Sequence, residues 1–343
     1  MGLDKILTKY QYFVAHQVPS IERLRSGILA FDIVTGGGIP IGRFIEFHGD
    51  KSTGKSTMAL KIANQFLQMD NRKAVYIDFE NTFDPKWSSH FISDMERMIV
   101  VQPDYGELGV DLFIELHKNA DEVGFIIIDS LATIVPTKEA ENDAFSSHIA
   151  PQARLISSMF RRVLPLVSQN NRSKKPITVI LINQIRNRID GYGRPGIVKP
   201  GGKMQDAIVS MDIRFYIKDY KVVNSIPVIA VYQVQVEKNK VGGHPKRAAQ
   251  FELCITPYKN LKIGDCDDLR LYISFMRKLN LLIREGNKWK LNENVFKNQD
   301  EVITFLQNSS EVKEKLANEI IEMSNKDLSF LLEDSDDSEL HNV

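Results

Sequence analysis

Residues 49–56 combine glycines, a lysine and hydroxyl side chains at the spacing of a phosphate-binding loop. The segment fits the pattern G-x-x-x-x-G-K-[ST] and reads Gly49-Asp50-Lys51-Ser52-Thr53-Gly54-Lys55-Ser56, followed by Thr57. Glycines let backbone N–H groups turn toward phosphate oxygens, while a lysine ammonium and a serine hydroxyl serve the β/γ-phosphates and Mg²⁺. The alternative is a chance glycine-lysine turn. It does not explain why an apolar stretch precedes the segment and a helical-period stretch follows it. We therefore call residues 49–56 the P-loop and expect residues 49–57 to bind ATP, with Lys55 on the phosphates and Ser56 on Mg²⁺.

Two other apolar stretches end in carboxylates that could share this site. Residues 125–128 lead into Asp129, which has the Walker B position for holding Mg²⁺ through water, together with Ser56. Residues 75–77 lead through Asp78-Phe79 into Glu80, our candidate general base for the water that attacks the γ-phosphate. A solvated loop carboxylate is the alternative interpretation of Glu80.

A fourth apolar stretch, residues 177–182, ends in Asn183-Gln184-Ile185-Arg186. An amide in this position can hydrogen-bond the γ-phosphate and respond to its loss, so Gln184 is a candidate sensor. The apolar stretches alternate with helical-period segments at 55–69 and 153–168. Such alternation is typical of βαβ units, and we expect an α/β fold with a mostly parallel sheet and helices on both faces.

The remaining chain predicts additions to this core. Three β-rich stretches, residues 208–217, 228–237 and 250–255, are expected as antiparallel additions to the sheet edge. Helical segments at 268–283 and 299–323 flank a turn-rich piece at 284–297, which indicates a small α+β C-terminal domain. The predicted divisions are an N-terminal oligomerisation arm (1–25), an ATPase core (26–258), the small domain (259–326) and a disordered acidic tail (327–343).

Composition excludes several other classes of protein. The 343 residues include 44 basic and 44 acidic side chains, so only local charge can indicate a nucleic-acid partner. Cys254 and Cys266 stand outside any C-x-x-C or Cys/His cluster, which argues against a disulfide framework or a zinc site. No apolar run approaches the roughly 18 residues of a membrane span, and the N-terminus lacks the apolar block of a signal peptide. We expect a cytoplasmic protein with no membrane partner.

Local charge is uneven between residues 161 and 203. This stretch contains one acidic residue, Asp190, and ten basic residues: Arg161, Arg162, Arg172, Lys174, Lys175, Arg186, Arg188, Arg194, Lys199 and Lys203. The region contains a glycine-rich segment, 190–202, with one aromatic side chain, Tyr192. Cations and amides can follow the phosphates of a single strand while a ring stacks on its bases. A solvated basic face is the alternative.

Several stretches distinguish this chain from other P-loop proteins. They are Ser26-Gly27-Ile28-Leu29-Ala30-Phe31-Asp32, Gly36-Gly37-Gly38-Ile39-Pro40-Ile41-Gly42-Arg43, Ile77-Asp78-Phe79-Glu80 with Asp84-Pro85, Gln102-Pro103-Asp104, Ile182-Asn183-Gln184-Ile185-Arg186 and Lys238-Asn239-Lys240. From about Ser26 to the tail, the chain resembles RecA-family homologous recombinases, close to the bacterial RecA proteins. The resemblance implies a RecA-type core and an ATPase that forms helical filaments on single-stranded DNA, pairs it with homologous duplex and exchanges strands.

The resemblance also assigns roles around the nucleotide. It makes Glu80 the glutamate of ATP hydrolysis, Gln184 the γ-phosphate sensor, and Asp84 and Trp87 adenine contacts, with Trp87 at a position where the family usually has tyrosine. Lys238 and Lys240 match a lysine pair that reaches the ATP of the neighbouring subunit in the filament. Without the resemblance, these lysines would be interpreted as an exposed lysine-rich turn.

The resemblance places DNA contacts on two loops, residues 139–147 and 185–202. The positions similar to family DNA contacts are Arg154, Arg161, Arg188, Gly201 and Gly202, and the basic region adds Arg186 and Tyr192. Because Gln184 directly precedes the longer loop, we expect γ-phosphate sensing and DNA binding to be linked there.

Three departures from the family pattern would suit a phage or other mobile-element member. The N-terminal arm is short, and Tyr192 is displaced by about one position. Only Arg214 remains of two adjacent arginines assigned to a secondary DNA site, so Arg214 or Lys218 would have to serve there. A hexameric helicase or translocase on the same core, and a non-catalytic ATP-binding regulator, are the alternative functions.

Overall fold

The computed structural model describes residues 16, 18, 20–137, 149–189, 195–242 and 246–326. Five neighbouring strands pair in parallel: β3 (Phe44–Gly49), β7 (Thr178–Gln184), β6 (Val123–Asp129), β4 (Lys73–Asp78) and β5 (Met98–Val101). Every residue of β3 and β6 is buried, as expected for strands that are covered on both faces. The parallel sheet confirms the predicted α/β fold.

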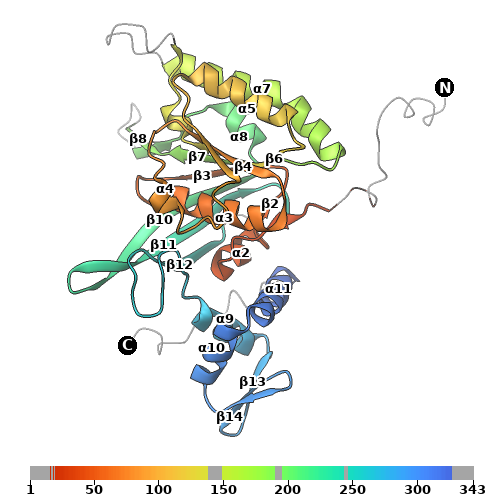
Figure 1. Cartoon of the computed structure of the whole chain (residues 1–343), viewed down its shortest axis with the longest axis vertical. Coiled ribbons are helices and arrows are strands. Elements are labelled where there is room, and N and C mark those ends of the chain that lie inside the picture. Colours follow the sequence, from red (N-terminus) through yellow and green to blue (C-terminus); the bar gives the residue numbers. More distant parts are fainter. Residues whose placement is uncertain are drawn as a thin grey trace, which may run out of the picture.

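Three further strands complete one side of this sheet. They are β10 (Met211–Val223), β11 (Ile226–Asn239) and β12 (Ala248–Cys254), and the full order is β12-β11-β10-β3-β7-β6-β4-β5 (Figure 1). The expectation of three antiparallel additions is wrong for β10, which pairs in parallel with β3. The reason is a crossover through the short helix α8 (Lys203–Ile208), which returns the chain to the end of the sheet where β3 begins. β11 and β12 are antiparallel, as predicted.

Helices cover both faces of the sheet (Figure 1). Helices α2 (Leu29–Thr35) and α3 (Lys55–Met69) pack on one face, and α5 (Gly106–Lys118), α7 (Ile149–Arg172) and α8 on the other. Successive side chains of β3 point to opposite faces, so Phe47 packs with Met58 of α3 while Phe44 meets Phe160 of α7 at 5.7 Å between ring centroids. The helices predicted at 55–69 and 153–168 match α3 and α7, whereas α5 was not predicted.

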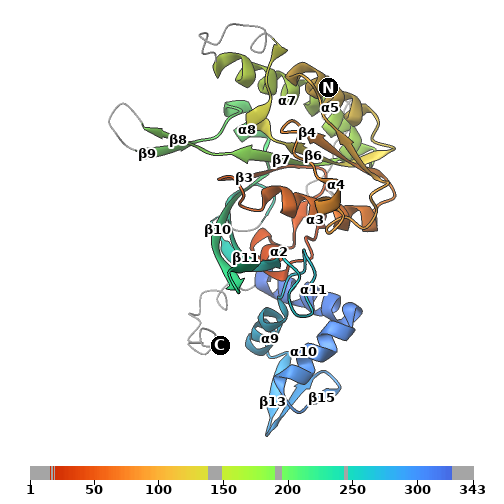
Figure 2. The same ribbon diagram turned by 60° about the vertical axis from the view of Figure 1, so that its left-hand side comes forward.

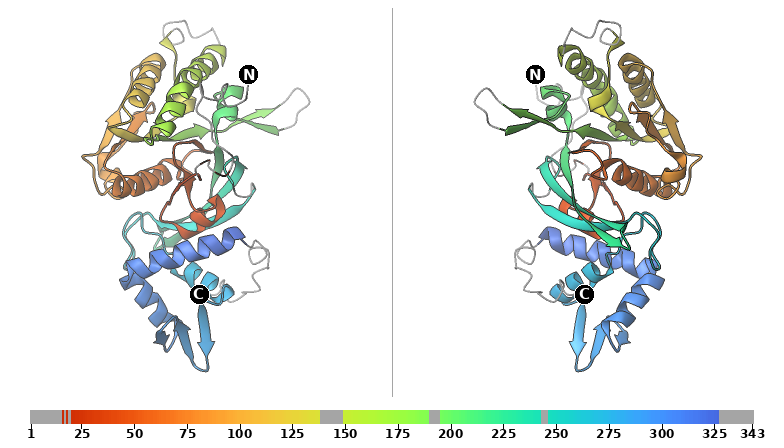
Figure 3. Two further views of the ribbon diagram at one scale, coloured as in Figure 1. Left: turned by 90° about the vertical axis from the view of Figure 1, so that its right-hand side faces the viewer. Right: turned by 90° about the vertical axis from the view of Figure 1, so that its left-hand side faces the viewer.

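The C-terminal elements form a separate cluster beside α2 (Figure 3). In chain order they are α9 (Leu269–Lys278), β13 (Leu282–Glu285), β14 (Lys288–Leu291), β15 (Asn294–Phe296), α10 (Gln299–Asn308) and α11 (Ser310–Lys326). The predicted helix 268–283 ends at Lys278, because Asn280 adopts a left-handed φ of 56°. The predicted helix 299–323 is two helices that meet at Ser309. Leu29 and Ile33 of α2 belong to the apolar cluster of this segment.

Two short pairs of strands and two short helices complete the described elements. β1 (Arg23–Leu24) pairs with β2 (Ile39–Pro40), and β8 (Arg186–Ile189) pairs with β9 (Pro195–Val198) in a hairpin that projects from the sheet (Figure 2). The short helices are α4 (Pro85–Ser88) and the 3-10 turn η2 (Leu131–Thr133). Among the described helices, none is long and apolar enough to cross a membrane.

Candidate nucleotide site and DNA-binding face

The parallel sheet brings the four predicted nucleotide segments to one edge. Register pairs Gly49 at the end of β3 with Gln184 at the end of β7, and Asp78 at the end of β4 with Asp129 at the end of β6. Since β3, β7, β6 and β4 are consecutive neighbours, the loops that follow them lie side by side. The carboxyl ends of parallel strands are the usual place for a ligand in such a sheet.

The glycines of the P-loop are required by close contacts. A Cβ atom on Gly49 would lie 2.3 Å from the carbonyl oxygen of Phe215, and one on Gly54 would lie 2.6 Å from the Tyr232 ring. Gly54 also has a φ of 83° and begins α3 without a side-chain cap. The first amides of α3 are therefore available to phosphate oxygens, which fits an ATP-binding loop.

Lys55 is buried inside the loop that it was predicted to serve. Its ammonium donates to the carbonyl oxygens of Gly49 at 3.2 Å and Asp50 at 2.5 Å, and to the Thr53 hydroxyl at 3.3 Å. Burial lowers the pKa of Lys55, and the nearby carboxylates of Asp129 and others oppose that shift. The loop thus wraps around a positive charge, as a phosphate site needs.

Ser56 and Asp129, the two predicted metal ligands, lie in direct contact. Ser56 Oγ donates to Asp129 Oδ2 at 2.7 Å, and the Tyr76 hydroxyl donates to the same oxygen. Burial raises the pKa of Asp129 to about 6, although these two hydrogen bonds favour the ionised form. A hydroxyl and a carboxylate are oxygen ligands of the kind Mg²⁺ prefers, so the pair fits this metal. Sequence reasoning missed Tyr76, whose only signal is a hydroxyl in an apolar strand.

Glu80 is held by donors from two other strand ends. Its Oε1 accepts from Ser130 Oγ at 2.6 Å and from Gln184 Nε2 at 2.7 Å. The loop that carries Glu80 is fixed in turn by the buried Asp78, which accepts from the backbone N–H groups of Glu80 at 3.2 Å and of Phe83 at 3.0 Å. Gln102 Nε2 donates to Asp78 at 3.0 Å. Asp78 and Gln102 stand in the sequence motifs without a predicted role, and Ser130 directly follows the predicted ligand Asp129.

Asp84 and Trp87 make contacts around α4. The Asp84 carboxylate caps this helix by accepting from Lys86 N at 2.8 Å. The half-buried Trp87 ring packs edge-on against Phe91 at 5.3 Å and against His90 at 6.0 Å between centroids. These contacts give both residues a structural task, and their role as adenine contacts stays a prediction.

Lys238, in β11, and Lys240, just after this strand, contact helix α8 with their side chains. Lys238 Nζ donates to the carbonyl oxygen of Asp206, and Lys240 Nζ donates to that of Ala207 at 2.5 Å. Cations are favoured at the C-terminal end of a helix, where carbonyl oxygens lack partners. Within one subunit, both lysines are therefore bound to the helix that follows the predicted DNA loop, rather than to the P-loop of the same chain.

Several predicted DNA contacts share one face of the molecule. Arg154 and Arg161 are exposed and lie seven residues apart, which puts them on the same side of α7. Gly202 borders this helix, since a Cβ built on it would lie 3.9 Å from the Ala153 side chain. Gly201 has a φ of 120° and contacts Gln205. This arrangement joins the end of the longer predicted loop to the start of α7.

Other parts of the predicted DNA site are only partly described. The backbones of Arg186 and Arg188 belong to β8, directly after Gln184. Tyr192, the whole 139–147 loop and the acidic tail lie outside the described residues. Of the two candidates for a secondary DNA site, Lys218 is exposed, whereas Arg214 is half-buried over the Tyr216 ring at 4.7 Å and 3.8 Å from Glu237.

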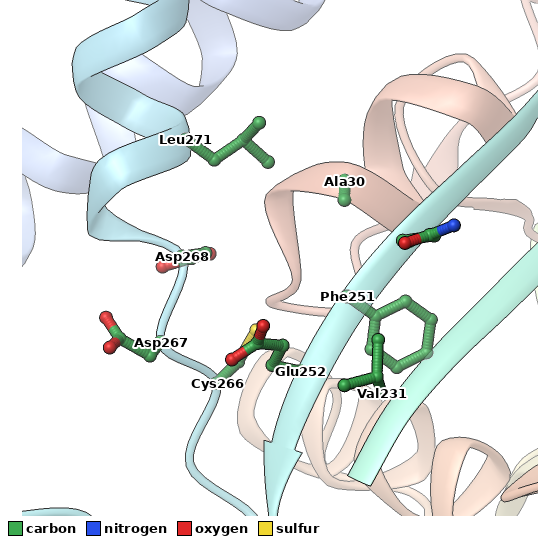
Figure 4. Close-up of a pocket in the computed structure, with 9 residues that line it drawn as sticks. Ala30, Val231, Phe251, Glu252, Cys266, Asp267, Asp268 and Leu271 are labelled. Atoms are coloured by element: carbon green, nitrogen blue, oxygen red, sulfur yellow. The ribbon is translucent and has the colours of Figure 1, made fainter. Parts of the chain in front are cut away.

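A cavity of about 170 Å³ lies away from these strand ends, between α2, β11, β12 and the start of α9 (Figure 4). Carboxylates of Glu252, Asp267 and Asp268 line it, together with Cys266 and apolar side chains. Carboxylates, even with Glu252 paired to Lys221 and Asp268 to Lys313, are poor partners for phosphates, so the cavity is not a second candidate for the nucleotide.

Comparison with known proteins agrees with these features. A family model described as "RecA N-terminal domain" matches residues 9–257. Curated relatives called "Protein RecA" include one from Nostoc sp., 31% identical over 309 residues that cover 89% of this chain and 82% of the relative. Another, from Rippkaea orientalis, is 30% identical over 323 residues, covering 93% of this chain and 88% of the relative.

Proposed function

The chain belongs to the RecA family, and on this basis we propose that it is an ATP-dependent recombinase that assembles on single-stranded DNA and exchanges strands with homologous duplex. Members of this family are DNA-dependent ATPases of recombination and repair that use ATP with Mg²⁺, and this chain is one of that general kind. The observation that best supports the finer proposal is the contact of Gln184 with Glu80, because Gln184 continues directly into the β8–β9 hairpin.

In the proposed mechanism, each group at the strand ends has one task. The P-loop amides and Lys55 bind the phosphates, and Ser56 with Asp129 would hold Mg²⁺, which neutralises phosphate charge when bound. Glu80 accepts a proton from the attacking water. Within the described part of the chain, Glu80 Oε2 accepts no hydrogen bond, so this oxygen is available for that water while Oε1 is held by Gln184 and Ser130.

Assembly would complete the site. In this proposal Lys238 and Lys240 leave α8 and contact the ATP of the adjacent subunit, where their charge stabilises the transition state of hydrolysis. ATP binding would then favour the filament that holds DNA, and hydrolysis would release it. Arg154, Arg161, Arg186, Arg188, Gly201 and Gly202, with Tyr192, would contact the strand.

Electron microscopy with single-stranded DNA and a slowly hydrolysed ATP analogue tests this function in one observation. Helical filaments that require both DNA and nucleotide are the expected result. Closed rings with directional unwinding would instead indicate the hexameric translocase, and monomers that bind ATP without hydrolysing it would indicate a regulator.

A further inference from the structure

A cluster of charged side chains is buried along the strand that leads into the P-loop. Glu46 and His48 of β3 and Asp212 of β10 have ligand atoms that lie within 4.8 Å of one another, a set able to hold a cation. Lys199 supplies that cation, with Nζ 3.1 Å from Glu46 Oε2 and 2.5 Å from Asp212 Oδ2. We call these four residues the buried charge cluster. None of them belongs to the predicted ATP-binding set.

The contacts of the Glu46 carboxylate explain why the buried charge cluster depends on Lys199. The residue is fully buried, and its Oε1 accepts from Asn183 Nδ2 at 2.9 Å and from Gln205 Nε2 at 2.6 Å. With Lys199 on Oε2, all three partners are donors, which suits the ionised carboxylate and not the protonated one. Burial and the neighbouring Asp212 raise the pKa of Glu46, and Lys199 opposes this shift. Its negative charge is therefore maintained largely by Lys199.

His48 fixes the second carboxylate. Its Nδ1 lies 2.7 Å from Asp212 Oδ1, and its Nε2 lies 3.4 Å from Glu237 Oε2. Both ring nitrogens thus face carboxylates, which favours the imidazolium form. Asp212 is held between His48 and Lys199, so its position also depends on the lysine.

The cluster connects segments with different proposed tasks. Lys199 directly follows Val198, the residue of β9 that pairs with Arg186 at the start of β8. Glu46 lies three residues before Gly49, and Asn183 directly precedes Gln184. Only Lys199 enters the cluster from the hairpin side, and its side chain is 19% exposed. Moving the hairpin end away would leave the buried Glu46 without its counter-charge and Asp212 with His48 alone, which is costly.

We infer that Lys199 is a positioning residue that fixes the end of the β8–β9 hairpin to the P-loop strand, so that a single strand bound at the hairpin changes ATP hydrolysis. The inference rests on the proposed function, which assigns DNA to this hairpin. The resulting chain of contacts runs from Lys199 through Glu46 and Asn183 to Gln184. It is a second link to the nucleotide, besides the direct continuation of β7 into β8.

The test compares ATP turnover with and without single-stranded DNA in full-length variants. Lys199→Met is expected to lower the DNA stimulation of turnover about 5-fold or more, a usual size for coupling between sites, while Kd for a fluorescent ATP analogue stays within about 3-fold. Lys199→Arg should restore most of the stimulation. Lys118→Met removes an exposed ion pair with Glu115 and is the matched control, expected to behave as wild type.

A charge-balanced variant guards against simple misfolding. Lys199→Met combined with Glu46→Gln removes one positive and one negative charge at nearly constant volume and leaves Asp212 paired with His48, so it should fold and still show weakened stimulation. Thermal unfolding of each variant checks folding separately. If the folded variants keep wild-type stimulation and DNA affinity, the inference is overturned. If the wild type itself shows no stimulation, the proposed function fails instead.

Discussion

Gln184 Nε2 donates a 2.7 Å hydrogen bond to Glu80 Oε1, which joins the end of β7 to the loop after β4 across the intervening strand β6. Ser130, at the end of β6, donates to the same oxygen at 2.6 Å. The candidate sensor and the candidate base are therefore in direct contact. A γ-phosphate that accepts a hydrogen bond from the Gln184 amide would remove one of the two donors from Glu80 Oε1. The mobility of the Glu80 side chain would then depend on the bound nucleotide.

Replacing Glu80 with glutamine tests its assignment as general base. Glu80→Gln keeps the size of the side chain and removes its ability to accept a proton, so turnover should fall at least ~100-fold. Binding of ATP and assembly on DNA should persist, because the P-loop is unchanged. Steady-state ATPase and nucleotide titration measure the two effects. Glu96→Gln, at an exposed position, is the control, and a near-normal rate for Glu80→Gln would refute the assignment.

Tyr76 offers a test of the metal site that needs no change to a ligand. Tyr76→Phe removes one of the two hydrogen bonds to Asp129 Oδ2 and leaves the bond from Ser56. The loss of one such bond corresponds to about 1 kcal/mol, so the Mg²⁺ concentration for half-maximal ATPase should rise roughly 5-fold. Titration of Mg²⁺ at saturating ATP measures it. An unchanged midpoint would mean that Tyr76 does not help to orient Asp129.

The nucleotide segments could be predicted from sequence because their signals are local. Residues 49–56 carry the phosphate-binding spacing, and Asp129 and Gln184 each follow a short apolar stretch. Parallel strand pairing then brings these strand ends together, as the register of Asp78 with Asp129 demonstrates. Local patterns are thus sufficient to predict which strand ends lie together.

Features that depend on distant contacts escaped prediction. Lys199 appeared only as one of ten basic residues, because its partners Glu46 and Asp212 lie 153 and 13 positions away. Tyr76 belongs to an apolar strand, and its contact with Asp129 exists only after β4 and β6 pair. The direction of β10 was also missed, since an isolated strand sequence does not reveal which neighbour it will join.

His117 should make stability depend on pH. The ring is buried between Phe44 and Phe113, its Nδ1 lies 2.9 Å from the Phe113 carbonyl oxygen, and its Nε2 has no partner among the described residues. Burial lowers the pKa of His117 to about 4. A folded-state pKa below the unfolded value means that protonation favours unfolding, so stability falls as the pH drops from about 6.5 to 4.

The measurement is urea unfolding at several pH values, with His117→Phe compared to wild type. Because folding lowers the pKa of His117 from about 6.5 to about 4, the wild type should lose roughly 3 kcal/mol of unfolding free energy between neutral pH and pH 4 through this residue. The difference in unfolding free energy between wild type and His117→Phe should change by about that amount over the same range. His90→Phe, at an exposed position, is the matched control. Parallel pH curves for wild type and His117→Phe would show that His117 contributes nothing to the acid sensitivity.

The positions of Lys238 and Lys240 lead to a test of the shared active site. Both lysines bind α8 of their own subunit, at the carbonyl oxygens of Asp206 and Ala207. If they act on the neighbour's ATP, a Lys238→Ala, Lys240→Ala double variant and Glu80→Gln will each be inactive alone for different reasons. In a mixed filament, some sites combine an intact Glu80 with intact lysines from the next subunit.

Equal mixing should therefore restore up to about a quarter of wild-type turnover, because half of the sites carry Glu80 and half of their neighbours carry the lysines in a head-to-tail assembly. The DNA-stimulated ATPase of the mixture measures this restoration. Glu80→Gln mixed with a Lys55→Ala, Glu80→Gln variant is the control, since no site in that mixture contains Glu80. A mixture of the first two variants that gives only the sum of their separate rates would mean that each lysine pair acts within its own subunit.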